Sequence, residues 1–167
     1  MQDKLLTDLL NVLKKEYEQY EKLKDTADKK TDTLVENEIE RLAEIVQDED
    51  EIISDIEELE IERNELIEKL LDIFDIKEDE INYRELTDYL PDKWQKQFDP
   101  IRDKLIDSIN SLHEKNEKNR MLLQEAVKLN NFSVNMLQKV LEPINQTYNK
   151  DKKQENKQGY NIVDRKA

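Results

Sequence analysis

Residues 5–23, LLTDLLNVLKKEYEQYEKL, carry the pattern that decides the fold. Apolar side chains recur there at alternating steps of three and four, and the pattern continues to residue 34: Leu6, Leu9, Leu10, Leu13, Tyr17, Tyr20, Leu23, Ala27 and Leu34. This spacing is typical of the buried seam of a coiled coil. It predicts one long helix over about residues 3–35.

The composition favours helices over sheets. The chain of 167 residues has one Gly and three Pro, and 41% of its residues are charged while 36% are apolar. It has no Cys, which excludes disulfides and thiolate chemistry and is typical of a reducing compartment. No run reaches the roughly 20 apolar residues that a membrane span needs. We therefore expect a cytoplasmic protein of one domain, without direct membrane insertion.

Negative charge is concentrated in one part of the chain. Residues 36–80 contain 20 Asp and Glu against four Lys and Arg, whereas the whole chain has a net charge of −14. Such density repels phosphate backbones, so nucleic acid is not an expected partner. The simplest interpretation is a solvated helix face.

A second helix is predicted over about residues 38–74. Asn37 and Glu40 resemble an N-cap and the third helical residue of a capping box. If the two helices form a hairpin that turns near residue 36, the numbers of two residues that face each other across it add up to about 72. Glu49 and Arg63 occupy apolar positions of the heptad, so we expect neighbours near Leu23 and Asp8 to compensate them as a structural polar core.

The remaining chain predicts a short bridging helix over about residues 79–90 and a third long helix over about 92–141. Pro100 predicts a kink or break, and Pro143 predicts the end of the helix. Residues 143–167 are polar and predict a flexible tail after a domain of residues 1–142. The expected fold class is all-α: an elongated antiparallel bundle or coiled coil of three long helices.

Two amides interrupt the third seam in LHEKNEKNRMLL, residues 112–123. Asn116 and Asn119 occupy positions where the heptad calls for apolar residues. Buried amides fix the register of a coiled coil by hydrogen bonding across it, at some cost in stability. We therefore place both in the structural polar core, at the boundary with the segment that follows.

The apolar sector widens beyond residue 121 to about 180° on a helical wheel. Leu123, Val127, Val134, Leu137 and Leu141 continue the first stripe, and a second stripe adds Leu122, Ala126, Leu129, Met136 and Val140, with Phe132 beyond it. Either the first two helices cover both stripes, or the second stripe is an exposed groove for an apolar or amphipathic partner segment.

No catalytic, metal or cofactor site is expected. The only His is His113 and the only Gly is Gly159, so paired-His metal sites and phosphate-binding glycine loops have no residues to form them. The run Asp48–Glu51 has no following Gly and lies within the helical pattern, unlike a calcium loop.

The residues around the two amides resemble a known family. Asn116, Asn119, Arg120 and Leu122, followed by Ala126 and Val127, resemble the NxxNRxLxxxAL stretch of the FlgN-type flagellar export chaperones. Residues in LLNVLKKEYEQYEKL and LEIER and the ending VDRKA are also similar to that family. No resemblance is found for residues 75–100.

The resemblance implies a chaperone and not an enzyme. It implies that the chain binds the hook-filament junction proteins, hook-associated proteins 1 and 3, through their C-terminal helical segments, and delivers them to the flagellar export gate. The cargo-binding residues would lie on the last helix: Leu122, Ala126, Leu129, Phe132, Met136 and Val140. The alternative is a structural or regulatory coiled-coil adaptor without an export role.

Overall fold

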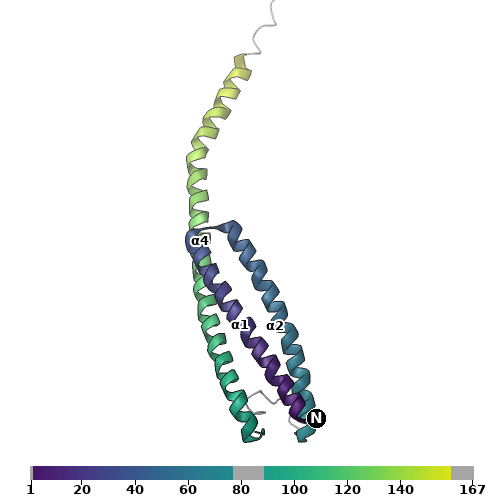
Figure 1. Cartoon of the computed structure of the whole chain (residues 1–167). Helices are drawn as coiled ribbons and strands as arrows, with labels where there is room; N and C mark the ends of the chain where they lie inside the picture. Colours follow the sequence, from purple (N-terminus) through teal and green to yellow (C-terminus); the bar gives the residue numbers. More distant parts are fainter. Residues whose placement is uncertain (1, 77–88, 159–167) are drawn as a thin grey trace, which may run out of the picture. The chain divides into compact units, whose positions relative to one another are not determined.

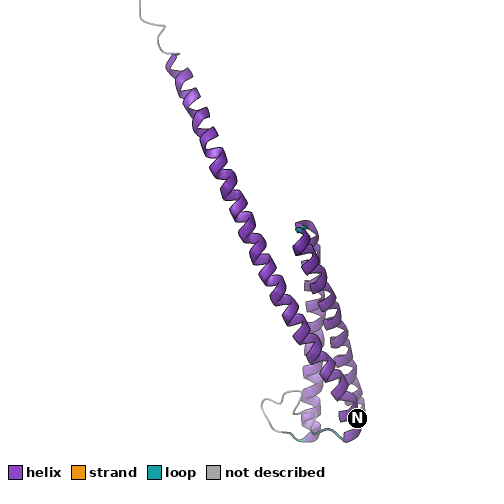
Figure 2. Ribbon diagram, turned by 90° about the vertical axis from the view of Figure 1, so that its left-hand side faces the viewer, coloured by secondary structure: helices purple, strands orange, loops and turns teal. Residues whose placement is uncertain are grey.

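The structure, a computed structural model, describes residues 2–76 and 89–158 and is helical (Figure 1). Helix α1 spans Gln2–Glu36, α2 spans Ile39–Phe74 and α4 spans Asp92–Gln158. Figure 2 shows no strand in this described part of the chain. The predicted all-α class is confirmed, whereas the bridging helix expected over 79–90 falls almost wholly outside the described residues.

The chain divides into two compact units, Met1–Leu123 and Gln124–Ala167. This division falls after Leu123, whereas the sequence placed the domain boundary after residue 142. The first unit contains every described residue that is buried. The second unit is treated separately below.

The core of the first unit is made by the predicted seam of α1, which packs against residues of α2, of α4 and of the segment before α4. Leu6, Leu9 and Phe98 have no exposed surface. The main cluster contains Leu6, Leu9, Leu10, Val12, Leu13, Leu66, Leu70, Leu90, Trp94, Phe98, Ile101 and Leu105. Burying one Leu of this kind contributes about 1.5–3 kcal/mol, so the seam dominates the stability of the unit.

A second, smaller cluster joins the same three helices further along. It contains Leu23 and Ala27 of α1, Ile56 of α2 and Leu112 of α4. Both clusters draw on α1, which lies beside α2 in Figure 1 and makes its contacts with α2 along much of its length.

The register between α1 and α2 differs from the expected one. The residue numbers sum to 79 for the bonded pairs Glu16–Arg63 and Lys30–Glu49 and to 74 for Gln19–Asp55, all above the expected value of about 72. Cβ atoms tilt toward the N-terminus of their own helix. In an antiparallel pair, each side chain therefore reaches the level of a lower-numbered backbone position of its own helix. The numbers of two residues whose side chains meet thus have a larger sum than those of two backbone positions at the same level, as observed.

Asn37 ends α1 and does not cap α2. Its φ of 58° places it in the left-handed region, and the Glu38 N–H donates to the Thr33 carbonyl at 3.1 Å. This is the Schellman ending, which satisfies a carbonyl at the helix C-terminus. The N-cap of α2 is Glu38, which makes no side-chain capping bond, so the predicted capping role of Asn37 is wrong.

The end of α2 repeats this arrangement with an Asp. Asp75 has a φ of 52°, and the Ile76 N–H donates to the Leu71 carbonyl at 3.1 Å. Asn and Asp are the residues other than Gly that adopt this conformation most readily. They therefore end both helices in a chain whose single Gly is at position 159.

Helix α4 is longer and more continuous than expected. It begins at the predicted Asp92, where the Pro91 carbonyl accepts from the N–H of Trp94 and of Gln95. It passes Pro100 without a break and continues through Pro143 to Gln158, so the helix does not end at residue 141. A proline removes one backbone hydrogen bond, and flanking residues of high helix propensity, such as Leu, Gln and Lys, let the helix resume.

Replacing Asn37 tests the ending of α1. We expect Asn37→Ala to lower the free energy of unfolding by about 1 kcal/mol, because alanine adopts a positive φ only at a steric cost. Asn37→Gly removes that cost and should leave the stability equal or higher. Urea unfolding followed by circular dichroism measures both, and equal losses in the two variants would contradict the role of the positive φ.

Candidate partner-binding surface

Residues 124–141 of α4 form an exposed apolar surface within the second unit. None of these residues is buried. Eight large apolar side chains are exposed by half or more of their surface: Val127, Leu129, Phe132, Val134, Met136, Leu137, Val140 and Leu141. Exposed apolar groups gathered in this density mark interaction sites on water-soluble domains.

The six residues predicted to bind a partner fall in different environments. Leu129, Phe132, Met136 and Val140 are exposed, with Leu129 at 66% and Phe132 at 61%. Ala126 is half-buried. Leu122 is also half-buried but belongs to the first unit.

The first stripe is exposed as well, and sequence reasoning left it out of the site. Val127, Val134, Leu137 and Leu141, which continue the first stripe, are exposed by 50–62%. Exposed apolar side chains therefore lie on both stripes of this segment, beyond the six residues predicted for the site.

The length of α1 explains why the seam ends where it does. Polar contacts pair α4 with α1 in parallel order: Trp94 donates to Asp3, and Asn119 contacts Ala27 and Thr31. The offset between paired residues is therefore about 90. The pairing that these contacts show runs from Trp94 to Asn119, within the first unit. Helix α1 ends at Glu36 and is much shorter than α4, so this difference in helix length is the signal in the sequence that the seam of α1 cannot pair with all of α4.

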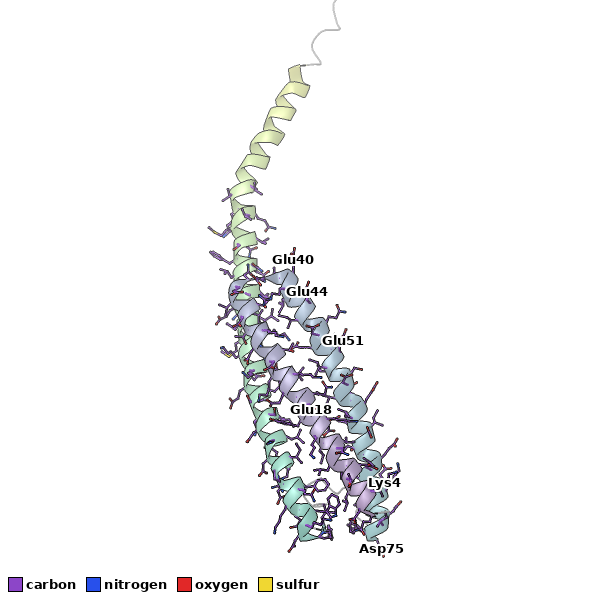
Figure 3. All side chains as sticks on the ribbon, viewed as in Figure 1. Lys4, Glu18, Glu40, Glu44, Glu51 and Asp75 are labelled. Atoms are coloured by element: carbon purple, nitrogen blue, oxygen red, sulfur yellow. The ribbon has the colours of Figure 1, made fainter. Side chains whose placement is uncertain are left out.

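The surface carries little charge. Between residues 124 and 141 only Glu125, Lys128 and Lys139 are charged, whereas α2 alone has 14 acidic and three basic residues. Glu40, Glu44 and Glu51, labelled along α2 in Figure 3, are exposed members of that acidic set. A segment of 18 helical residues is about 27 Å long, so a partner helix of five turns could lie along it.

Asn119 is a buried amide that joins α4 to α1. It is 4% exposed, its Nδ2 donates to the Ala27 carbonyl at 2.8 Å, and its Oδ1 accepts from the Thr31 hydroxyl at 2.6 Å. An amide buried with both groups bonded fixes the register of the helices it joins.

Asn116 differs from the expectation of a second buried amide. The residue is exposed and lies on the wall of a pocket beside α2. The residues of α4 that meet α1 here are Leu112, Lys115 and Asn119. Asn116 lies about 60° around the helix from Asn119, on the side of this pocket.

Arg63 and Glu49 each meet an oppositely charged residue of α1. Arg63 Nη1 donates to both oxygens of Glu16, at 2.8 and 3.0 Å, and Glu16 is 1% exposed. Glu49 accepts from Lys30. Burial raises the pKa of the Glu16 carboxyl, and the guanidinium of Arg63 opposes this increase without cancelling it.

The described residues include no group of three or more His, Asp or Glu positioned to hold a metal ion. None of the helices in that part of the chain is long and apolar enough to cross a membrane.

A family model described as FlgN protein matches residues 1–156. The chain belongs to the FlgN family. The match includes residues 75–100, where the motifs gave no resemblance. No curated protein and no solved structure matches the chain.

Membership gives this FlgN chain a general role. The family consists of flagellar export chaperones that bind hook-associated proteins, and it is not a family of enzymes. The match extends over the first unit and over the exposed apolar surface of the second.

Two asparagines three residues apart allow a matched test of this FlgN chain. We expect Asn119→Ala to cost about 1–3 kcal/mol of unfolding free energy, because it removes the buried partner of Ala27 and Thr31. Asn116→Ala should change the stability by less than about 0.5 kcal/mol, because its side chain is exposed. Denaturant unfolding measures both, and similar losses would rule out a specific role for Asn119.

The raised pKa of Glu16 predicts a pH dependence. The folded-state pKa lies above the ordinary value of 4.5, so the protonated carboxyl favours the folded state. That stabilisation is full below the ordinary pKa and is lost as the pH rises through the raised pKa. Glu16→Gln lacks this titration, so the stability of the original protein relative to the variant should increase from pH 7 to pH 5. Urea unfolding at both values measures this, and the opposite trend would mean that Arg63 outweighs burial.

Proposed function

We propose that this chain is a cytoplasmic chaperone of flagellar type III export, whose cargo is hook-associated proteins 1 and 3. The observation that carries this proposal is the set of eight exposed apolar side chains on residues 124–141 of a FlgN-family chain. The first unit, an elongated antiparallel bundle of three helices in this proposal, supports the helix that presents them.

The cargo segment would be amphipathic and helical. An amphipathic helix binds an apolar surface through side chains spaced by three and four residues. Leu129, Phe132, Met136 and Val140, with Ala126 and the adjoining Leu122, would form the contact. Met136 would adapt the surface to cargo segments of different shape, because its side chain is unbranched and flexible.

Binding of this kind would keep the cargo unassembled. A C-terminal segment that packs against other subunits in an assembled filament has an apolar face that must be covered before export. Covering about 800 Å² on each partner is enough for a specific complex. The chaperone would then deliver its cargo to the export gate, where the export apparatus drives release.

Three serine substitutions test the cargo surface. We expect Leu129→Ser, Phe132→Ser and Met136→Ser together to weaken binding of the C-terminal segments of hook-associated proteins 1 and 3 by roughly 100-fold or more, because each removes buried apolar contact. Calorimetric titration of each segment into the full chain measures the affinity. Circular dichroism should show unchanged helicity.

A matched control replaces Asn130, Asn135 and Gln138 by Ser on the same helix and should bind normally. A third variant, with Val127, Val134 and Leu141 replaced by Ser, measures the contribution of the first stripe. Full affinity in the Leu129, Phe132 and Met136 variant would reject the proposed residues. A rod-shaped dimer without affinity for either cargo segment would instead identify a structural or regulatory adaptor.

A further inference from the structure

The first unit contains a second apolar opening, on the side where α2 and α4 face each other. A pocket of about 380 Å³ lies beside the turn that joins α1 and α2. Its apolar walls come from all three helices: Leu23, Leu34, Leu42, Val46, Ile53 and Leu123. The opening is confined to this end of the unit, because Leu66 and Leu70 of α2 share the main core cluster with Phe98 of α4 at the other end.

Apolar side chains continue along both edges of the opening. Val46 and Ile53 of α2 are 40% and 42% exposed, and Ile109 of α4 is 43% exposed. Positions 46 and 53 are seven residues apart, so they lie on one line along α2. Helix bundles bury such lines against a neighbouring helix. The two edges therefore match the surface that a fourth helix would cover.

Charge along the α2 edge restricts the kind of helix that fits. Asp50 and Glu57 alternate with the apolar pair, in the order Val46, Asp50, Ile53 and Glu57. Both carboxylates are exposed, and neither has an ion-pair partner among residues 2–76 and 89–158. Charges that flank the seam of a coiled coil select oppositely charged residues on the partner.

We propose that the α2–α4 groove binds an amphipathic helix of a partner protein, with an apolar seam in the groove and Lys or Arg on the flank next to Asp50 and Glu57. The residues that line this groove all belong to the first unit, whereas the proposed cargo surface on residues 124–141 belongs to the second.

Two designed helical peptides test the proposal on the full chain. Both have about three heptads with Leu at the seam positions. One has Lys at the flanking positions and the other has Glu. We expect the Lys peptide to bind at least roughly tenfold more tightly than the Glu peptide, measured by fluorescence anisotropy, because several flanking charge pairs change sign. Equal binding of the two peptides, or no binding, would overturn the proposal.

Variants of the protein locate the binding. Val46→Ser with Ile53→Ser should weaken binding of the Lys peptide at least roughly tenfold. The matched control, Val35→Ser with Ile61→Ser, changes one Val and one Ile that are more exposed, at 68% and 62%, and should bind normally. Asp50→Lys with Glu57→Lys should reverse the preference to the Glu peptide. An unchanged preference would overturn the assignment of the flank.

Two further measurements separate other occupants of the groove. The variant with serine at positions 129, 132 and 136 should keep its affinity for the Lys peptide, and loss of that affinity would place the peptide on the cargo surface instead. Analytical ultracentrifugation of the full chain should not reveal a dimer that is lost in the variant Val46→Ser with Ile53→Ser. Such a dimer would show that a second copy occupies the groove, contrary to the proposal.

Discussion

The apolar face of α1 is the constraint on which the first unit depends. Its seam contributes Leu6, Leu9 and Leu13 to the core shared with α2 and α4. The polar contacts add to it: Glu16 and Lys30 bond α2, and Asp3, Ala27 and Thr31 bond α4. Helix α1 thus aligns α2 and α4, and the length of α1 limits how much of each of these two helices it can contact.

That constraint also accounts for the division of α4. The first part of the helix has α1 beside it and carries the buried residues Phe98, Leu105, Leu112 and Asn119. The second part, from Gln124 onward, belongs to the second unit. The helix nevertheless keeps its apolar residues, and these exposed side chains support the proposed binding of cargo. Asn119, bonded at both ends of its amide, is the last buried residue before the change.

Much of this organisation could be predicted from the sequence, because it depends on periodicity. The seam of α1, the start of α4 at Asp92 and the widened apolar sector after Met121 follow from spacing, and Asn116, Asn119 and Arg120 carry the family resemblance. The α1–α2 register also depends on the direction in which side chains lean from each helix, and the spacing of apolar residues carries no information about this direction. Asn is common both at helix N-caps and at C-terminal endings, and only the positive φ of Asn37 shows that it ends α1.

The misassigned residues have physical explanations. Asn116 and Asn119 both fit the heptad, and only the position of α1 decides that one is buried and the other exposed. Pro143 predicts the end of a helix, but the helix continues to Gln158, because a single proline removes only one backbone hydrogen bond. The six residues predicted for the site omit most of the first stripe, because periodicity alone does not show which apolar residues of a helix remain exposed.

The unequal charge of the two units has a consequence for encounters with other charged molecules. Residues 1–123 have a net charge of −17, whereas residues 124–167 have five acidic and eight basic residues and a net charge of +3. A polyanion, such as a membrane surface rich in acidic lipids, repels the first unit and attracts the second. Long-range electrostatics therefore favours encounters of a negatively charged object with the second unit, which carries the exposed apolar side chains, and this preference weakens as salt increases.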